Sequence, residues 1–231
     1  MLSGSNPTIA AVFLLAGGLL APHAPLSFVP QAASSPATGA AADAGPGFTS
    51  DLGFSFDYPK DWEVVDSKPM MPAVQMEAQQ KADSDLEKRG AACTQVALLV
   101  RHGDPASVIV TVALPYDCYG TKFAQSDLSG VGSGAAKGLE SSFDLKDPIY
   151  GAYKSGSHSL WIERAHGNAK GHPEMTYTIE TVCGLLDKSM VCWIGMMKDD
   201  ANLKLFEDSL VTLEGDKPTA LVPANAFAPA K

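Results

Sequence analysis

The stretch that decides the fold is residues 175–213, MTYTIETVCGLLDKSMVCWIGMMKDDANLKLFEDSLVTL. Residues 175–184 are rich in Thr, Tyr, Ile and Val, which suit a pleated, half-buried surface. Residues 190–197 form a second apolar run, and residues 186–189 between the two runs, three of which are polar, fit a short turn. This pattern predicts a β-hairpin.

One amphipathic helix is predicted to follow the hairpin. After Lys198 the chain reads DDANLKLFEDSL, and the two acids at its start suit the positive end of a helix dipole. Leu203, Phe206 and Leu210 recur at helical spacing, so their side chains can face one sheet. The stretch therefore supplies two strands and the helix that packs on them, and it indicates a fold rather than a chemistry.

The four cysteines predict two disulfides. Their even number, without a C-x-x-C pair, fits an oxidising compartment and argues against a zinc cluster or a thioredoxin-like motif. A hairpin turn between Cys93 and Cys118 would bring these two residues together. A two-residue turn at 187–188 places Cys183 opposite Cys192 at a non-hydrogen-bonded position. We therefore expect the bridges Cys93–Cys118 and Cys183–Cys192.

The two ends of the chain are predicted to lie outside the folded domain. Residues 9–20, IAAVFLLAGGLL, form an apolar block of signal-peptide length, although no Lys or Arg precedes it. We expect a signal peptide over 1–24, a disordered Ala/Pro/Ser-rich linker over 25–47, one domain over 48–216 and a disordered tail over 217–231. Export would make the protein periplasmic or secreted, with no stable membrane span after signal removal. The alternative is a floppy apolar N-terminal tail.

The charge of the chain limits its partners. Its 231 residues carry a net charge of -9, which argues against nucleic acid, because phosphate binding needs a basic patch. An anionic membrane surface is disfavoured for the same reason. The Gly-rich run 130–138 lacks the Gly-Lys-Ser/Thr ending of a phosphate loop, so no cofactor is expected. Its glycines could instead let a helix over 122–143 lie close to a sheet, or they could break that helix.

The two ends of the predicted domain carry short motifs: residues 51–66, DLGFSFDYPKDWEVVD, hold an aromatic-x-aromatic-x-Tyr-Pro-x-x-Trp pattern, and the last helix reads LKLFEDSLVTL. These motifs resemble the start and the end of PsbP-like domains, a family with exported bacterial members. The resemblance implies an α+β fold, an antiparallel β-sheet flanked by helices in a PsbP-like α-β-α sandwich. It carries over no catalytic residues. It implies an exported, non-catalytic binding or assembly module that acts on an unknown protein partner.

A second resemblance concerns ALLVRHGDP, residues 97–105. An apolar strand that ends in Arg-His-Gly resembles the histidine phosphatase and phosphoglycerate mutase family. The resemblance implies that His102 accepts a phosphoryl group and that Arg101 holds phosphate. A hairpin turn is the favoured interpretation, because a second β-like run starts within a few residues of Gly103. A phosphoryl-transfer enzyme is therefore kept as an alternative function.

A metal-binding protein is the other alternative. His158, His166 and His172 lie close in sequence to Glu163 and Glu174, and imidazole and carboxylate groups can bind zinc. The spacing matches no metal motif, and exposed polar side chains are the favoured interpretation of this segment.

Overall fold

The computed structural model describes residues 47–69, 71–80, 85–120 and 122–227, so the predicted signal peptide and almost all of the predicted linker lie outside the described residues. The strands are β1 (Gly47–Thr49), β2 (Phe54–Asp57), β3 (Glu63–Val64), β4 (Gln95–His102), β5 (Ser107–Pro115), β6 (Phe143–Ser155), β7 (His158–Ala169), β8 (His172–Leu185), β9 (Ser189–Met197), β10 (Leu210–Leu213) and β11 (Thr219–Ala220). The helices are α2 (Met71–Gln80), α3 (Asp85–Cys93), α4 (Tyr116–Tyr119), the short 3-10 helix η2 (Gln125–Asp127), α5 (Leu128–Leu139) and α6 (Asp200–Asp208).

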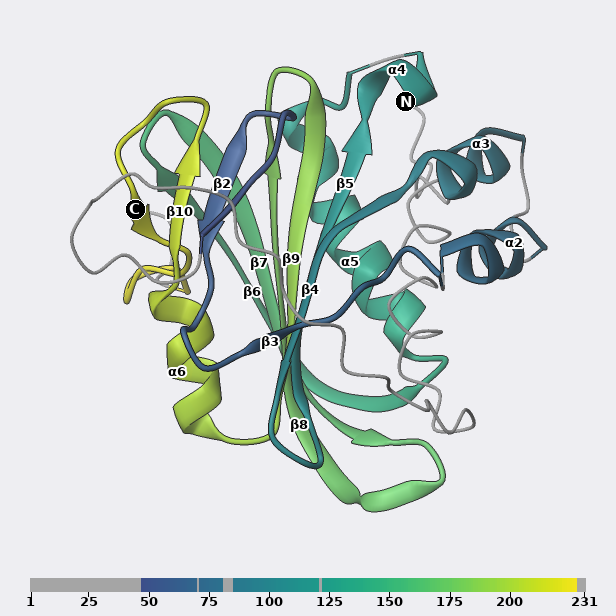
Figure 1. The fold of residues 1–231 in the computed structure, drawn as a ribbon, viewed down its shortest axis with the longest axis vertical. Coiled ribbons are helices and arrows are strands. Elements are labelled where there is room, and N and C mark those ends of the chain that lie inside the picture. The colour runs from purple at the N-terminus through teal and green to yellow at the C-terminus, as the bar shows by residue number, and fades with distance from the viewer. Residues whose placement is uncertain (1–46, 70, 81–84, 121, 228–231) are drawn as a thin grey trace.

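Antiparallel strands dominate the molecule. A seven-stranded sheet has the order β3-β4-β5-β9-β8-β7-β6, and a four-stranded sheet has the order β1-β2-β10-β11 (Figure 1). Every pair of neighbouring strands is antiparallel. The fold is therefore α+β, as predicted, and a second small sheet covers much of the face on which α6 lies.

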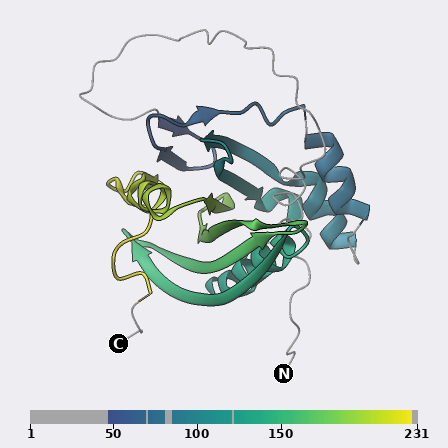
Figure 2. The ribbon, with the colours of Figure 1, turned by 90° about the horizontal axis from the view of Figure 1, so that it is seen from below.

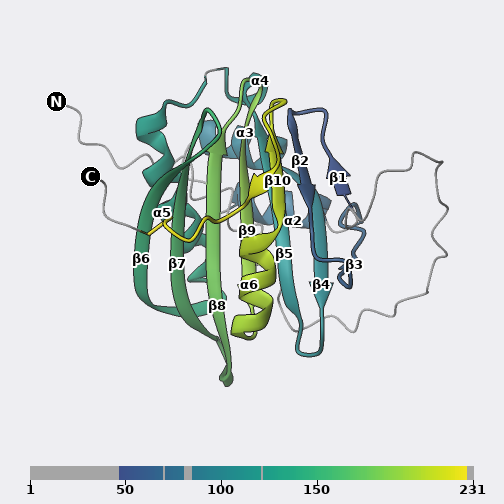
Figure 3. The ribbon, with the colours of Figure 1, turned by 90° about the vertical axis from the view of Figure 1, so that its left-hand side faces the viewer.

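The two faces of the large sheet carry different layers. Figure 3 shows α6 and the C-terminal segment in front of the sheet and α5 behind it, and Figure 2 shows how strongly β6 and β7 curve. On the α6 face, the fully buried Trp193 packs on Phe54 and Phe56, with ring centroids 5.7 and 6.2 Å away. The alternating aromatic residues of β2 thus help to bury one face of the small sheet against the large sheet.

The hairpin of β8 and β9 has the predicted register. Cys183 lies opposite Cys192 and Leu185 lies opposite Met190. The cysteines form the two predicted pairs at disulfide distance: the Cα atoms are 4.2 Å apart in Cys183–Cys192 and 5.9 Å apart in Cys93–Cys118. The first pair is buried on the α5 face of the sheet.

We expect the Cys183–Cys192 bridge to stabilise this hairpin by about 2 kcal/mol, because the loop that it closes is short. Replacing both residues by Ala should lower the melting temperature of the oxidised protein. The difference in melting temperature between wild type and variant should shrink when both are melted with a reductant, because only the wild type has a bridge to lose. Equal melting of the two oxidised proteins would contradict the expectation.

The C-terminal segment is packed, which differs from the disordered tail expected from residue 217. β11 pairs with β10, and Leu221, Val222 and Ala226 are buried. The hydroxyl of Tyr153 on β6 donates a hydrogen bond to the carbonyl of Leu221. Low charge and many Ala and Pro residues suggested disorder, but the two consecutive aliphatic residues at 221–222 are enough to fix the segment on the sheet.

The predicted helices are present with different limits. The helix after the hairpin begins as expected, and Asp199 caps it by accepting a hydrogen bond from the Asn202 amide at 2.8 Å. It ends at Asp208, because Leu210 starts β10 and is exposed rather than facing the sheet. The helix considered over 122–143 is shorter, because α5 begins at Leu128 after η2 and ends at Leu139. No helix in the described ranges is long and apolar enough to cross a membrane.

Candidate binding site at the β6 edge

β6 is the last strand of the large sheet, and within the described ranges no other strand pairs with its outer edge. β6 is long, with 13 residues from Phe143 to Ser155. Ile149 and Tyr150 are 47% and 49% exposed, which is unusual for large apolar side chains on a well-paired strand. A long edge strand with exposed apolar groups is a surface on which another chain can add a strand.

A β-bulge determines which way the β6 side chains point. The register breaks between Lys146 and Ile149, where β6 holds one residue more than β7. Asp147 has a φ of 52° and precedes Pro148, and both features suit a bulge on an edge strand. Because the extra residue shifts the alternation by one, Tyr150 and Ala152 point to the α5 face of the sheet.

A groove of about 330 Å³ lies on that face beside β6. The residues that line it come from η2 and the start of α5, from β6, and from the start of β7: Gln125, Ser126, Leu128, Ser129, Ala152, Tyr153, Lys154, Ser159, Leu160 and Trp161. Trp161 lies opposite Ala152, and both residues line the groove. The groove therefore combines aromatic side chains with hydroxyl and amide groups.

The glycines of α5 allow the helix to lie directly on Trp161. A Cβ at Gly132 would come within 2.5 Å of indole atoms Cδ1 and Nε1, which is closer than any side chain can approach. The Tyr150 ring lies on the other side, with its centroid 6.1 Å from that of Trp161 and its plane tilted by 33°. Of the two alternatives for the glycine-rich run, the structure has the helix that lies close to the sheet, over 128–139, and its contact determines the position of the indole.

We expect Gly132→Ala to destabilise the protein by about 1 kcal/mol, because the overpacking outweighs the better helix propensity of Ala. Gly130 on the same helix is the matched control, since no described atom lies within 4 Å of its Cβ position. Gly130→Ala should stabilise the protein by up to about 1 kcal/mol. Urea unfolding of both variants checks the pair, and stabilisation by both substitutions would contradict the close contact at Trp161.

Glu163 lies next to Trp161 on the same face of β7, directly opposite Tyr150. It is only 4% exposed, and in the described part of the chain neither its Oε2 nor the Nε1 of Trp161 has a hydrogen-bond partner. Burial, with a smaller contribution from the carboxylate of Glu140, raises the pKa of Glu163 to about 7. Burial also raises the pKa of Tyr150, with a smaller contribution from Glu163.

Trp161, Tyr150 and Glu163 together can recognise a ligand. Unpaired buried polar atoms are rare in folded proteins, because each forgoes the hydrogen bonds that water would supply. Here an N–H donor and a carboxylate oxygen without partners lie beside two aromatic rings. From the sequence, Glu163 was a possible metal ligand, and no motif singled out Trp161. The useful signal was the hairpin turn at residues 156–157, which sets Tyr150 opposite Glu163.

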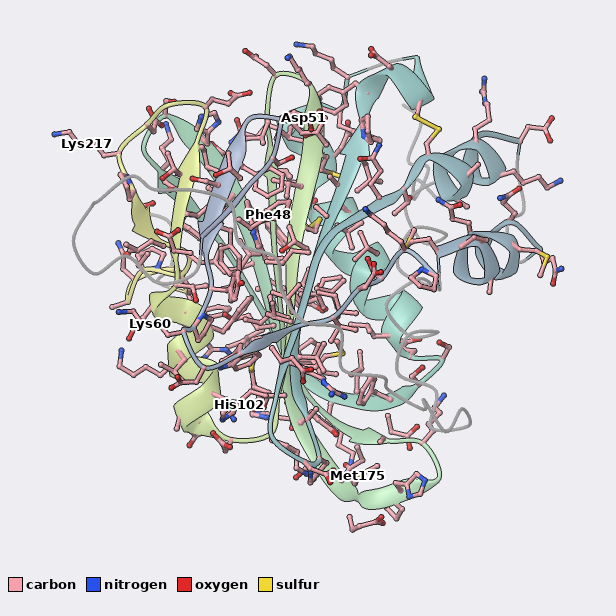
Figure 4. All side chains as sticks on the ribbon, viewed as in Figure 1. Phe48, Asp51, Lys60, His102, Met175 and Lys217 are labelled. Atoms are coloured by element: carbon pink, nitrogen blue, oxygen red, sulfur yellow. A yellow bond between two sulfur atoms is a disulfide. The ribbon has the colours of Figure 1, made fainter. Side chains whose placement is uncertain are left out.

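The Arg-His-Gly segment forms the hairpin that sequence analysis favoured. His102 ends β4 and pairs with Ser107 of β5, and Figure 4 shows it at the lower end of that hairpin. Its ring stacks on Trp62 with centroids 5.7 Å apart. Arg101 donates hydrogen bonds from Nε and Nη2 to Glu63 at 3.0 and 2.9 Å. The carboxylates of Asp61 and Asp104 line the same hollow as Arg101 and His102. Together with Glu63 they would repel a phosphate group there.

The three candidate metal-binding histidines lie far apart. His158 is at the start of β7, within 3.7 Å of carboxylate oxygens of Glu214 and Asp216. His166 lies eight residues along the same strand, and strand geometry puts that separation at roughly 26 Å. His172 contacts Glu174 at 3.3 Å beyond the end of β7. Among residues that the structure describes, no group of three or more His, Cys, Asp or Glu residues could hold a metal ion.

A buried ion cluster lies on the opposite face and ties α6 to the sheet. Arg164 donates a hydrogen bond to Glu180 at 2.6 Å and also contacts Glu207 of α6. Its guanidinium lies 4.7 Å from the ring centroid of Phe227 in the C-terminal segment. Burial raises the pKa of Glu180 to about 7, although the charge of Arg164 opposes the increase. Since each of these groups contacts another part of the fold, the cluster is structural.

Comparison with known proteins gives little further information. No protein-family model matches the sequence, and no curated protein matches it closely enough to count as a relative. Among solved structures the chain is similar to cyanobacterial PsbP (CyanoP) from Synechocystis sp. PCC 6803, determined in solution. The similarity has a TM-score of 0.41 and 12% sequence identity, and it covers 74% of this chain and 90% of that chain. The two chains share too little geometry at this TM-score for the likeness to indicate a function.

Proposed function

We propose that this protein is an exported, non-catalytic binding module with a PsbP-like α-β-α sandwich, and that it binds an extended segment of a protein partner along β6. The observation that carries the proposal is the outer edge of β6, with which no strand in the described ranges pairs, together with Tyr150 exposed beside the groove. An added strand would pair with the β6 backbone, and its side chains on the α5 side would reach Trp161.

Export is supported by the cysteines. All four lie in pairs at disulfide distance, and such pairs persist in oxidising compartments. The PsbP-like architecture is supported by the aromatic pattern at the start of the domain, where the alternate residues Phe54 and Phe56 are both buried between the sheets. A non-catalytic role is supported by the side chains of Arg101 and His102. Arg101 bonds to Glu63 and His102 stacks on Trp62, so both contact other parts of the fold.

The partner is expected to carry positive charge. The chain has a net charge of -9, so a basic segment would be attracted at long range and an acidic one would be repelled.

The proposal is tested by selecting peptides from a random displayed library on the oxidised protein and measuring their affinities for two variants. Tyr150→Ser removes the exposed ring on β6, and we expect it to weaken binding about tenfold, as the loss of an aromatic anchor does. Val64→Ser is the matched control, because Val64 is 55% exposed on β3, the opposite edge strand of the same sheet.

Unchanged affinity of the selected peptides for the Val64→Ser variant would support the assignment to β6. Failure to enrich any peptide, or equal losses in the two variants, would overturn it.

A further inference from the structure

The charges around Glu163, which lies opposite Tyr150 of β6, indicate the charge of the ligand that this site can bind. Burial and the nearby Glu140 both disfavour the ionised form of this carboxyl group, and its Oε2 has no hydrogen-bond partner among the described residues. A buried carboxylate without a partner is unfavourable, whereas a cation placed beside it would supply the missing partner and relieve the repulsion from Glu140.

The neighbouring rings favour an organic cation. Trp161 and Tyr150 lie on the same face as Glu163, with ring centroids 6.1 Å apart. Their negative π-faces attract a guanidinium or ammonium group, and indole is the strongest attractor among the protein side chains. A planar guanidinium can stack on a ring and donate hydrogen bonds to a carboxylate at the same time.

The site is close enough to the surface to be reached. Tyr150 is about half exposed and lies directly opposite Glu163, and Trp161 on the same face lines the groove beside β6. On the inner side Glu163 faces the buried Thr181 of β8, and the Cβ position of Gly132 on α5 is 3.7 Å from Oε2. A side chain arriving along β6 therefore meets the Tyr150 and Trp161 rings next to the buried Glu163 carboxylate.

We propose that Glu163, Trp161 and Tyr150 form a subsite for the cationic side chain of an arginine or lysine in the partner segment. This subsite rests on the proposed function of β6 and gives it a specificity. Among the side chains that the structure describes, the groups that face Glu163 with charge or a titratable proton are Glu140, just after α5, and Tyr150 on β6. Cation binding requires the ionised form of Glu163, so affinity should rise with pH.

The test uses N-acetyl-arginine N-methylamide as the probe and the citrulline analogue as its neutral isostere. The indole N–H signal of Trp161, assigned with a Trp161→Phe variant, reports binding by NMR. We expect the arginine probe to shift this signal and the citrulline probe to leave it unchanged. Between pH 6 and pH 8 the affinity for the arginine probe should rise about tenfold, as the ionised fraction of a group titrating near pH 7 does.

Glu163→Gln should weaken binding of the arginine probe at least fivefold at pH 8 and remove the pH dependence. Glu174→Gln, at an exposed carboxylate far from the groove, is the control. It should change neither the affinity for the arginine probe nor the pH dependence of that affinity. Equal binding of the two probes, or unchanged binding by the Glu163→Gln variant, would overturn the subsite. If selected peptides bind β6 while the arginine probe does not bind, the subsite fails and the proposed function stands. If the probe binds and no peptide does, the subsite stands and strand addition at β6 fails.

Discussion

Leu221→Ala should destabilise the protein by about 3 kcal/mol, which is the usual loss for a leucine removed from a closed core. Leu221 is 0% exposed and lies in the core between the two sheets, although it belongs to a segment rich in Ala and Pro. Its amide donates a hydrogen bond to the Ser209 carbonyl at 2.8 Å, and its carbonyl accepts one from Tyr153. These hydrogen bonds hold the backbone at residue 221 in place, so it cannot move inward to fill the cavity that Leu221→Ala leaves.

Leu210→Ala is the matched control for this substitution. Leu210 is 43% exposed at the start of β10, so its truncation should cost less than about 1 kcal/mol. Urea unfolding followed by tryptophan fluorescence measures both variants. Similar losses for the two leucines, or no loss for Leu221→Ala, would mean that the segment around Leu221 does not pack on the sheet in solution.

The second large effect is a stability that depends on the ionisation of Glu163. The folded pKa of this group is about 7, which is above its ordinary value of 4.5. Below pH 4.5 the carboxyl is protonated in both states, and its contribution to stability is fully present. As the pH rises through 7, the unfolded state is already ionised and the folded state must lose the proton from a buried site. The free energy of unfolding therefore falls by up to about 3 kcal/mol between pH 4.5 and pH 8.

Glu163→Gln isolates this effect, because glutamine keeps the shape and cannot ionise. Wild type and variant should have similar stability near pH 4.5, and the variant should be more stable by about 2–3 kcal/mol at pH 8. Glu180, whose pKa is also raised, is unchanged in the variant and cancels in the difference. Unfolding free energies measured at both pH values check the prediction. A difference between the two proteins that stays constant with pH would contradict it.

Local patterns in the sequence predicted the parts of the fold that depend on neighbouring residues. The β8–β9 hairpin follows from two apolar runs around a polar turn, and counting outward from that turn gives the Cys183–Cys192 register. The N-terminus of α6 follows from its two acids, and Asp199 is its cap. Each of these features is determined within about fifteen residues, which is the range over which periodicity and turn chemistry act.

The structure differs from the sequence-based predictions where segments that are distant in the sequence contact each other. The order of the segment around Leu221 depends on Tyr153 and Ser209, which no local pattern connects to it. The candidate site has the same origin, because Trp161 and Glu163 acquire their environment from Tyr150 across the hairpin and from Gly132 on α5. A bulge at Asp147 turns Tyr150 to that face, and bulges leave only a weak mark in a sequence.

The most direct measurement of the central claim is amide hydrogen exchange of the protein with and without a selected peptide. Strand addition at β6 predicts that alternate amides within residues 149–154, those that point away from β7, gain protection when the peptide is bound, because they then donate to its carbonyls. The amides of Glu63 and Val64 on the opposite edge of the sheet should be unchanged. Protection at β3, or no added protection along β6, would contradict the account.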